Sequence, residues 1–455
     1  DEVNALIFDF GSSMSRIGYA GEESPRLVFP TLAGYYRHGS CGCRDTRCAD
    51  GAITTDTSAA NPASAASGRT APRRHGKRRY YIGESAVYGW RPEMEVVAPV
   101  QNGVITDWDA YAGLWDWIYD TQLRLDPREH PLLLSEAALA PRADHATLMQ
   151  LAFEQFDVPA LYLARAPVLS AFALGRPTAL VLDVGMDGAT AAPVVDGYPI
   201  RKATRTAPVG GSYLDALTSQ LLADDRTLAG ERIDALTPAY LLASRRAVEA
   251  QQTPAITLRD DRVARTRPSF HRMSVNRVVA EFKEMVLQVA ETPFDASLLA
   301  GRPAKAFEFP NGYNRPFGPE RFRLPESLFD PAFCPLTDAG TARLPGAAYR
   351  GLPSLVQDAI QACDVDVRPQ LWNSVVVVGG TTLVPGFNDR LRSALEAVQP
   401  GVKIKVHSTA HAAERRFSSW LGGSILGSLG TFHQLWITKE EYEEKGFAVV
   451  DKRLQ

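Results

Sequence analysis

The sequence predicts an α/β protein built from two related lobes. Residues 5–11 (ALIFDFG) return almost unchanged as residues 179–185 (ALVLDVG), and each copy is an apolar run that ends in Asp-x-Gly. A continuous apolar run of this length is typical of a strand that is buried on both faces. At 455 residues, the chain also exceeds what a single hydrophobic core usually serves. The repeat and the length together predict two sheets of similar construction.

Composition narrows the class of protein. With 45% hydrophobic and 22% charged residues, the chain has the composition of an ordinary soluble globular protein. Its net charge of −3 gives no overall attraction to nucleic acid or to an anionic membrane surface. The sequence has no stretch of about 18 uninterrupted apolar residues, which excludes an ordinary membrane span. Five cysteines, an odd number in a long chain, favour a reducing cytosolic or nuclear environment.

The first elements are short strands followed by an insertion. Residues 5–34 predict three strands (ALIFDFG, SRIGYAG and RLVFPTLAG). Residues 37–79 are mostly Ala, Ser, Thr, Gly and Arg, with almost no large apolar side chain. Such a stretch cannot bury enough surface to offset its ordering entropy, so it predicts a mobile insertion. Its basic end, residues 73–79 (RRHGKRR), is expected to be a solvated loop, with a contact to nucleic acid or an acidic partner as the alternative.

Helical and strand patterns alternate through the rest of the chain. Residues 102–109 (NGVITDWD) predict the capped start of a helix that carries Tyr111, Leu114 and Trp115. Residues 300–350 are rich in Pro and Gly and poorly periodic. The other predicted elements, in chain order, are an amphipathic helix over residues 144–156, a strand near residues 160–164, a helix over residues 167–174, mainly helical patterns from residue 210 to about residue 289 (notably 214–222 and 278–289), a buried strand at residues 375–378, a helix that opens at residues 385–387, and an apolar, glycine-interrupted helical region over residues 420–436.

Each Asp-x-Gly hairpin has the features of a phosphate-binding turn. The glycine permits a turn at positive φ, so that backbone N–H groups can close around an anion. In the first hairpin, residues 11–14 (GSSM) offer hydroxyl and N–H groups, and Arg16 can add charge-assisted hydrogen bonds. The second hairpin is formed by residues 183–188 (DVGMDG). We expect Asp9 and Asp183 to face a divalent cation through its water molecules, because Mg²⁺ keeps much of its hydration shell.

A third glycine motif strengthens this interpretation. Residues 379–386 (GGTTLVPG) follow a strand and precede a helix, a context in which glycine allows close backbone approach to a ligand. Taken alone, Asp-x-Gly or Gly-Gly after a strand is often only a tight turn. Two copies in matching contexts, with a third motif downstream, favour a clamp for a polyphosphate and its divalent metal.

The order of these motifs, followed by residues 419–437 (SWLGGSILGSLGTFHQLWI), resembles the actin superfamily. The resemblance covers the chain except for residues 37–79 and parts of residues 223–275 and 300–350. It implies the two-lobed actin-like ATPase fold, in which duplicated ribonuclease-H-like domains form four subdomains around a cleft. The cleft of this fold holds ATP with Mg²⁺ or Ca²⁺.

Within the superfamily, three segments resemble the nuclear actin-related proteins. They are residues 414–420 (ERRFSSW), 439–444 (KEEYEE) and 195–198 (VDGY). The subdomains implied by the resemblance are residues 1–31, 99–173 and 418–455 (subdomain 1), residues 32–98 with the insertion at about 37–79 (subdomain 2), residues 174–208 and 338–417 (subdomain 3), and residues 209–337 (subdomain 4).

The resemblance also assigns roles to individual positions. The implied nucleotide-binding residues are Asp9, Gly11, Ser12, Ser13, Met14 and Arg16 in the first phosphate loop, Asp183, Gly185, Met186 and Asp187 in the second, Gly210, Lys283 and Glu284 near the ribose and adenine, Gly379, Gly380, Thr381 and Leu383 in the adenosine motif, and Arg416 beside the adenine. Asp9 and Asp183 are the implied metal positions. Arg16 stands where actin has Lys.

Two positions that activate water in actin are changed. Hydrolysis requires a water that is placed in line with the γ-phosphate and deprotonated. Where actin has a Gln and a His for this purpose, the resemblance places Ala166 and Thr190. Alanine can orient no water, threonine is a poor base at neutral pH, and the acidic residue of the second loop is displaced from Met186 to Asp187. The sequence therefore predicts ATP binding with very slow or absent turnover and no catalytic residue, unless a one-residue shift of the loop lets Asp187 rescue some activity.

The resemblance implies an interaction protein rather than an enzyme. Its relatives are nuclear subunits of chromatin-remodelling and histone-acetyltransferase complexes, which pair with actin on a helicase/SANT-associated helix of a scaffold subunit. Contact with a nucleosome or linker DNA would be indirect, and no membrane is involved. Filaments are not expected, because residues 37–79 replace the loop through which actin contacts the next protomer. The alternatives are an active actin-like ATPase, a polymerising actin and a sugar-kinase-like phosphotransferase on the same superfold.

Other candidate residues carry weaker signals. A Cys₃His zinc site could be supplied by His38, Cys41, Cys43 and Cys48. The spacing Cys-x-Cys-x₄-Cys is tighter than in usual structural sites and lies in the low-complexity insertion, so a zinc site is disfavoured. We expect Cys334 and Cys363 to be buried hydrophobes and the tryptophans to lie in the core. Ordinary structural roles are expected for His407 and His411.

Overall fold

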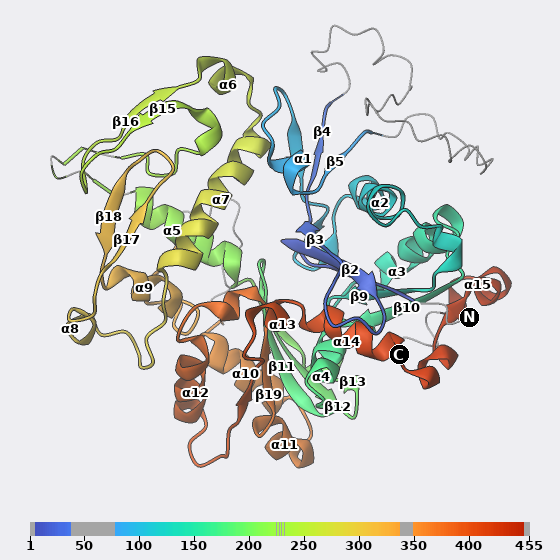
Figure 1. Ribbon diagram of the computed structural model, residues 1–455. Helices are drawn as coiled ribbons and strands as arrows, with labels where there is room; N and C mark the ends of the chain where they lie inside the picture. The colour runs from blue at the N-terminus through green and yellow to red at the C-terminus, as the bar shows by residue number, and fades with distance from the viewer. Residues whose placement is uncertain are drawn as a thin grey trace, which may run out of the picture.

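Two six-stranded sheets form the centres of two lobes, as the repeat predicts (Figure 1). The computed structural model describes residues 5–37, 78–336 and 349–449, apart from residues 224, 227, 229 and 232. The first sheet has the order β21-β10-β9-β1-β2-β3, with β1 (Leu6–Phe10), β2 (Met14–Tyr19), β3 (Leu27–Pro30), β9 (Leu132–Glu136), β10 (Ala160–Arg165) and β21 (Ile437–Thr438). The second has the order β13-β12-β11-β19-β20, with β11 (Ala179–Val184), β12 (Ala189–Val195), β13 (Tyr198–Pro199), β19 (Val375–Val378) and β20 (Val406–His407), and β14 (Arg205–Ala207) pairs with β12.

The repeated segment occupies the same place in both sheets. Strand β1 pairs antiparallel with β2 and parallel with β9, and β11 pairs antiparallel with β12 and parallel with β19. Both strands are buried along almost their whole length, as expected for strands covered on two faces. This duplication places Asp9 and Asp183 at equivalent strand ends, and both residues line the space between the lobes.

Two helices join the lobes at the base of this space. Helices α4 (Ala166–Ala173) and α14 (Ser418–Gly427) pack against each other, and Figure 1 shows them between the two sheets. Their backbones approach so closely that a Cβ atom on Gly422 would collide with the Leu169 carbonyl group. Trp420 is fully buried beside Ile7 of β1. The glycines of the C-terminal segment therefore serve helix packing.

The remaining elements surround the sheets. The longer helices are α2 (Trp108–Asp116), α3 (Arg142–Met149), α5 (Gly211–Ala223), α7 (Pro268–Val286), α10 (Leu352–Gln361) and α12 (Phe387–Val398). Shorter helices are α1 (Glu84–Tyr88), α6 (Asp260–Arg265), α8 (Ala296–Leu299), α9 (Glu320–Glu326), α11 (Arg368–Trp372), α13 (Ala412–Arg416) and α15 (Lys439–Lys445). Small sheets are formed by β4 (Ala33–Tyr35), β5 (Tyr81–Ile82) and β6 (Glu95–Val97), by β7 (Val100–Gln101) and β8 (Val104–Ile105), by β15 (Leu242–Arg246) and β16 (Ala255–Leu258), and by β17 (Lys305–Glu308) and β18 (Asn314–Phe317).

The structure corrects several predicted elements. The mainly helical pattern expected from residue 210 to about residue 289 is interrupted by the β15–β16 hairpin, whose residues are mostly exposed and therefore carry no periodic apolar signal. The poorly periodic residues 300–350 contain the β17–β18 hairpin and α9. The helix predicted over residues 144–156 is α3 followed by a π-helical segment. The third predicted strand is two strands, β3 and β4, because the chain turns after Pro30.

The expectations for the cysteines and the tryptophans are confirmed. Cys334 and Cys363 are buried and unbridged, and burial raises the pKa of each thiol. All tryptophans are buried or partly buried. Among the described residues, no helix is both long enough and apolar enough to cross a bilayer. The proposed subdomain boundaries stay a prediction.

Candidate functional site

One large cavity of about 2490 Å³ lies between the lobes. It exceeds the roughly 300–1,000 Å³ of a typical small-molecule pocket, so it is an open cleft rather than a closed chamber. Seventeen of the eighteen residues that the resemblance assigned to nucleotide binding line it: Asp9, Gly11, Ser12, Ser13, Met14, Arg16, Asp183, Gly185, Met186, Asp187, Lys283, Glu284, Gly379, Gly380, Thr381, Leu383 and Arg416. Gly210 is buried behind the second loop, and its neighbour Gly211 lines the cavity in its place.

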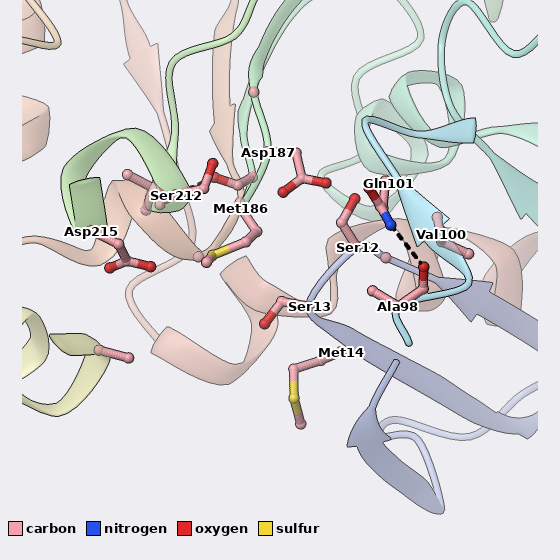
Figure 2. A pocket seen from close by; sticks show the side chains of 18 of the residues that line it. Ser12, Ser13, Met14, Ala98, Val100, Gln101, Met186, Asp187, Ser212 and Asp215 are labelled. Carbon is pink, nitrogen blue, oxygen red and sulfur yellow. Dashed lines mark hydrogen bonds between the residues drawn. The ribbon is translucent and has the colours of Figure 1, made fainter. Parts of the chain in front are cut away.

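The predicted first phosphate loop is the β1–β2 turn. The Gly11 N–H group donates to the Met14 carbonyl oxygen at 3.1 Å, which closes the turn and leaves Ser12 and Ser13 facing the cavity (Figure 2). Arg16 lies opposite Asp9 in the β1–β2 register, and its guanidinium donates to Asp9 Oδ2 at 3.1 Å. Arg16 is therefore held by the aspartate and does not extend freely into the cavity.

Asp9 is buried inside a hydrogen-bond network. Besides Arg16, the hydroxyl group of Ser135 donates to its Oδ1, and Ser419 Oγ donates to its Oδ2 at 2.9 Å. Ser135 is the last residue but one of the neighbouring strand β9, and Ser419 is the second residue of α14. The network fixes the direction of the carboxylate before any ligand arrives.

The predicted second phosphate loop connects β11 to β12. The turn is closed by the Gly185 N–H group, which donates to the Gly188 carbonyl oxygen at 2.9 Å. The prediction of a positive φ at the Asp-x-Gly glycines was wrong, because Gly11 and Gly185 both lie outside that region. The Gly185 carbonyl oxygen accepts hydrogen bonds from the Gly211 N–H group at 3.0 Å and from Thr381 Oγ1 at 2.8 Å. The loop is therefore held by the start of α5 and by the third glycine motif.

The third motif packs directly against Asp183. Gly379 has a φ of 95°, and a Cβ atom there would collide with the Asp183 carboxylate and the Val184 carbonyl group. Only glycine tolerates both this positive φ and this close approach of neighbouring atoms. Burial, and after it the charge of Asp9, raises the pKa of Asp183 to about 6. Both carboxylates line the cavity, and a divalent cation between them would offset the repulsion of their charges.

Asp187 makes a contact that the sequence did not predict. The Asn102 N–H group donates to Asp187 Oδ2 at 2.8 Å, which joins the β7–β8 hairpin to the second loop. Asn102 adopts a φ of 52°, a left-handed conformation that asparagine tolerates better than most residues. Figure 2 shows Asp187 near Ser12 and Gln101. The carboxylate of Asp187 already accepts a hydrogen bond from Asn102, so it is a poorer candidate for a general base.

Three predicted residues line the cavity from α7 and α13 and form two separate sets of contacts. Lys283 Nζ donates to Asp215 Oδ1 at 2.6 Å and to the Gly211 carbonyl oxygen at 3.1 Å. Glu284 and Arg416 form an exposed ion pair at 3.2 Å. Asp215, on α5, is a lining residue that sequence reasoning missed, because its partner lies 68 positions away.

Ala166 and Thr190, which stand where actin has its water-activating Gln and His, both line the cavity. Ala166 is the first residue of α4, and Thr190 lies on β12 opposite Asp183 in the β11–β12 register. Glu136 is an acidic residue that also lines the cavity, and it belongs to a buried cluster of ionisable side chains. Its carboxylate contacts Arg165 at 3.1 Å and His145 at 2.9 Å. Neither Ala166 nor Thr190 supplies a general base, and the carboxylate of Glu136 is engaged with Arg165 and His145.

A second interlobe contact closes the outer edge of the cleft; we call it the rim contact. It joins α1 and β6 to the start of α7, next to α6 (Figure 1). Trp90 Nε1 donates to Thr266 Oγ1 at 2.9 Å, and the Val96 N–H group donates to Ser269 Oγ at 3.0 Å. The apolar residues buried in the rim contact are Val87, Met94, Phe270 and Met273. The lobes are therefore bridged at the base of the cleft, near the second loop and at the rim.

The structure gives limited information on the two weaker candidate sites, the possible zinc site and the basic segment. His38, Cys41, Cys43 and Cys48 lie outside the described residues, as does most of the basic segment 73–79. Of that segment, Arg78 and Arg79 are described, and their guanidinium groups lie over tyrosine rings. No group of three or more His, Cys, Asp or Glu side chains that could hold a metal occurs in the described part of the chain.

Comparison with known proteins finds relatives of the whole chain in the actin family. A sequence profile of the family described as Actin matches residues 1–455. Actin-related protein 4 of Mycosarcoma maydis is 37% identical, over 100% of this chain and 98% of the relative. Actin-related protein 4 of Arabidopsis thaliana is 34% identical, over 100% of this chain and 99% of the relative. A Schizosaccharomyces pombe protein named SWI/SNF and RSC complexes subunit arp42 is 34% identical, over 100% of this chain and 98% of the relative.

Proposed function

The chain belongs to the actin family, and we propose that it is a nuclear actin-related subunit of chromatin complexes that keeps ATP as a structural ligand. One observation carries the proposal. The residues suited to phosphate and metal gather in one cavity, whereas the two water-activating positions are Ala166 and Thr190. The cavity can therefore hold a nucleotide without the groups needed to break it down.

The donor set fits a nucleotide with a divalent cation. Asp9 and Asp183 would hold Mg²⁺ or Ca²⁺ through its waters, and the cation supplies positive charge that neutralises the triphosphate. The raised pKa of Asp183 supports this assignment, because a cation removes the repulsion between the carboxylates. The residues of the turns that follow Asp9 and Asp183 would supply backbone N–H groups to the phosphates, and the third motif, which lines the same cavity, would contact the nucleoside.

The same lining favours binding over turnover. A general base must lie within hydrogen-bond reach of the attacking water. Ala166 has no polar side-chain atom, Asp187 is held by Asn102, and Glu136 is engaged with Arg165 and His145. This arrangement also disfavours the alternatives of an active actin-like ATPase and a phosphotransferase.

The relatives support a role in chromatin complexes. One of them is named as a subunit of the SWI/SNF and RSC complexes, and several others are named actin-related protein 4. By extension, this chain would work in the nucleus as a remodeller subunit, with histone-acetyltransferase complexes as a further host. Within such a complex it would form a heterodimer with actin on the helicase/SANT-associated helix of a scaffold subunit, so that any contact with a nucleosome or linker DNA is indirect. The sequence of residues 37–79 argues against a filament.

A single-turnover assay with radiolabelled ATP tests the central claim. The wild-type protein should retain one ATP per chain after gel filtration in Mg²⁺ and release almost no phosphate. The double variant Ala166→Gln, Thr190→His restores the water-activating side chains and serves as the comparison for catalytic competence. Actin-like hydrolysis by the wild-type protein would reject the proposal, and so would failure to retain nucleotide. Co-purification from nuclei, with identification of the partners, tests the assembly independently.

A further inference from the structure

Asp215 carries a buried oxygen atom that nothing in the described structure satisfies. The residue lies in the second turn of α5, and its side chain is only 8% exposed. Oδ1 accepts a hydrogen bond from Lys283 Nζ at 2.6 Å, whereas Oδ2 has no hydrogen-bond partner among the described residues. Burial raises the pKa of Asp215, and Lys283 opposes the rise. An unsatisfied buried carboxylate oxygen is costly and calls for an explanation.

Asp215 and the residues around it form part of the wall of the cavity. Asp215, Lys283, Met186 and Gly211 all line the cavity, and Figure 2 shows Asp215 and Met186 on the side opposite Ser13 and Met14. A Cβ atom on Gly211 would lie 2.7 Å from Met186 Sδ and 3.3 Å from Lys283 Nζ, so the thioether and the ammonium group meet above this glycine. A thioether is only a weak acceptor. The strong acceptor in this part of the wall is the free oxygen of Asp215.

Lys283 and Asp215 together match one kind of ligand group. An ammonium group has three N–H donors, and Lys283 uses two of them on Asp215 and Gly211. The pair therefore offers one remaining donor beside one free acceptor. A hydroxyl group can accept the first and donate to the second. Phosphate oxygens can only accept, and an exocyclic amine of a base mainly donates.

We propose that Asp215 is a positioning and specificity residue that orients Lys283 and accepts a hydrogen bond from a ribose hydroxyl of the bound nucleotide. The inference rests on the proposed nucleotide site and adds to it the residue that distinguishes ribose from deoxyribose. A nucleotide that lacks this hydroxyl leaves Oδ2 buried and unpaired. Sites built to bind a hydroxyl group discriminate strongly against analogues that lack it.

The test compares the affinities of the full chain for ATP, 2′-deoxy-ATP and 3′-deoxy-ATP by titration calorimetry in Mg²⁺. The wild-type protein should bind at least one deoxynucleotide about tenfold or more weakly than ATP. The Asp215→Asn variant, which keeps the shape of the side chain, should bind ATP more weakly and lose most of this preference. Asp358→Asn, at an exposed position of α10 outside the cavity, is the matched control and should keep the wild-type preference.

The variants separate a specificity role from a structural one. If Asp215→Asn unfolds because Lys283 is left unpaired, the double variant Asp215→Leu, Lys283→Met replaces the pair by apolar groups of similar volume. That variant should bind ATP and the deoxynucleotides with nearly equal affinity. ATP binding by the wild-type protein without discrimination, or an unchanged preference in either variant, overturns this inference and leaves the proposed function standing. Absence of any nucleotide binding overturns both.

Discussion

At the scale of single residues, Asp183 links the cavity to the stability of the protein. Its pKa is raised to about 6 by burial and by Asp9, so the folded protein holds this proton more tightly than the unfolded chain. Stability falls with rising pH wherever the unfolded state binds fewer protons than the folded state. The contribution of Asp183 is therefore present at low pH and is lost as the pH rises through about 6.

We predict that nucleotide-free protein loses stability through Asp183 between pH 4 and pH 7. A pKa shift of about two units corresponds to at most about 3 kcal/mol, and partial solvent access reduces this figure. Urea unfolding in the presence of a chelator, from pH 4.5 to 7.5, measures the effect. In Asp183→Asn the loss with rising pH should be absent, so the difference between the two proteins isolates this carboxylate. The prediction would be contradicted if the difference in the free energy of unfolding between the two proteins stayed constant across this pH range. It would also be contradicted if that difference favoured the wild-type protein at high pH.

At the scale of elements, local patterns explain which parts of the site could be predicted. The hairpins at Asp9 and Asp183 and the motif at Gly379 are short-range features, because each is a strand followed directly by the residues of its turn. Their backbone geometry is encoded within a few positions, and the structure brings them together. Strands β1, β2, β10, β11 and β19 were predicted from such local patterns, whereas the buried strands β9 and β12 were not predicted.

Features that depend on distant pairings were not predictable. Asn102 and Asp187 are 85 positions apart, and Trp90 and Thr266 are 176 positions apart. No periodicity or motif in the sequence connects such pairs, since each partner has an ordinary local context. The β15–β16 hairpin was missed for a different reason, because a mostly exposed hairpin needs no apolar alternation.

The rim contact leads to a prediction about nucleotide exchange. Opening the cleft at its edge must break the hydrogen bond between Trp90 and Thr266 and separate Trp90 from the Arg262 guanidinium, which lies 4.7 Å from its ring. Trp90→Phe keeps an aromatic ring but removes the hydrogen bond, a loss of about 1 kcal/mol. We expect release of a fluorescent ATP analogue, chased with excess ATP in a stopped-flow instrument, to become about fivefold faster.

A matched substitution distinguishes this effect from general destabilisation. Trp108 is also partly buried, but it packs against Tyr111 in another part of the molecule. Trp108→Phe should leave the release rate close to that of the wild-type protein. Equal acceleration in both variants, or none in Trp90→Phe, would show that the rim contact does not limit exchange.

At the scale of the whole molecule, a bound nucleotide would connect elements from both lobes. The cavity is lined by the first loop on β1 and β2, by the second loop on β11 and β12, and by α7. A ligand that binds only the folded protein stabilises it by mass action. If ATP is a structural ligand, stability should therefore rise with the free ATP concentration although no turnover occurs.

We predict that the free energy of unfolding increases by about 1.4 kcal/mol for each tenfold rise in free ATP above the dissociation constant, and by about 4 kcal/mol at a thousandfold excess. Urea unfolding at fixed Mg²⁺ and several ATP concentrations measures this slope. Probes in both lobes should report one transition that moves together, because the ligand contacts both sheets. In Gly379→Ala the added methyl group would collide with Asp183 and the Val184 carbonyl group, so this variant should be less stable than the wild-type protein without ATP and should respond more weakly to ATP. A wild-type transition that stays fixed as ATP increases, or that moves in one lobe alone, would show that the cleft does not use ATP to hold the lobes together.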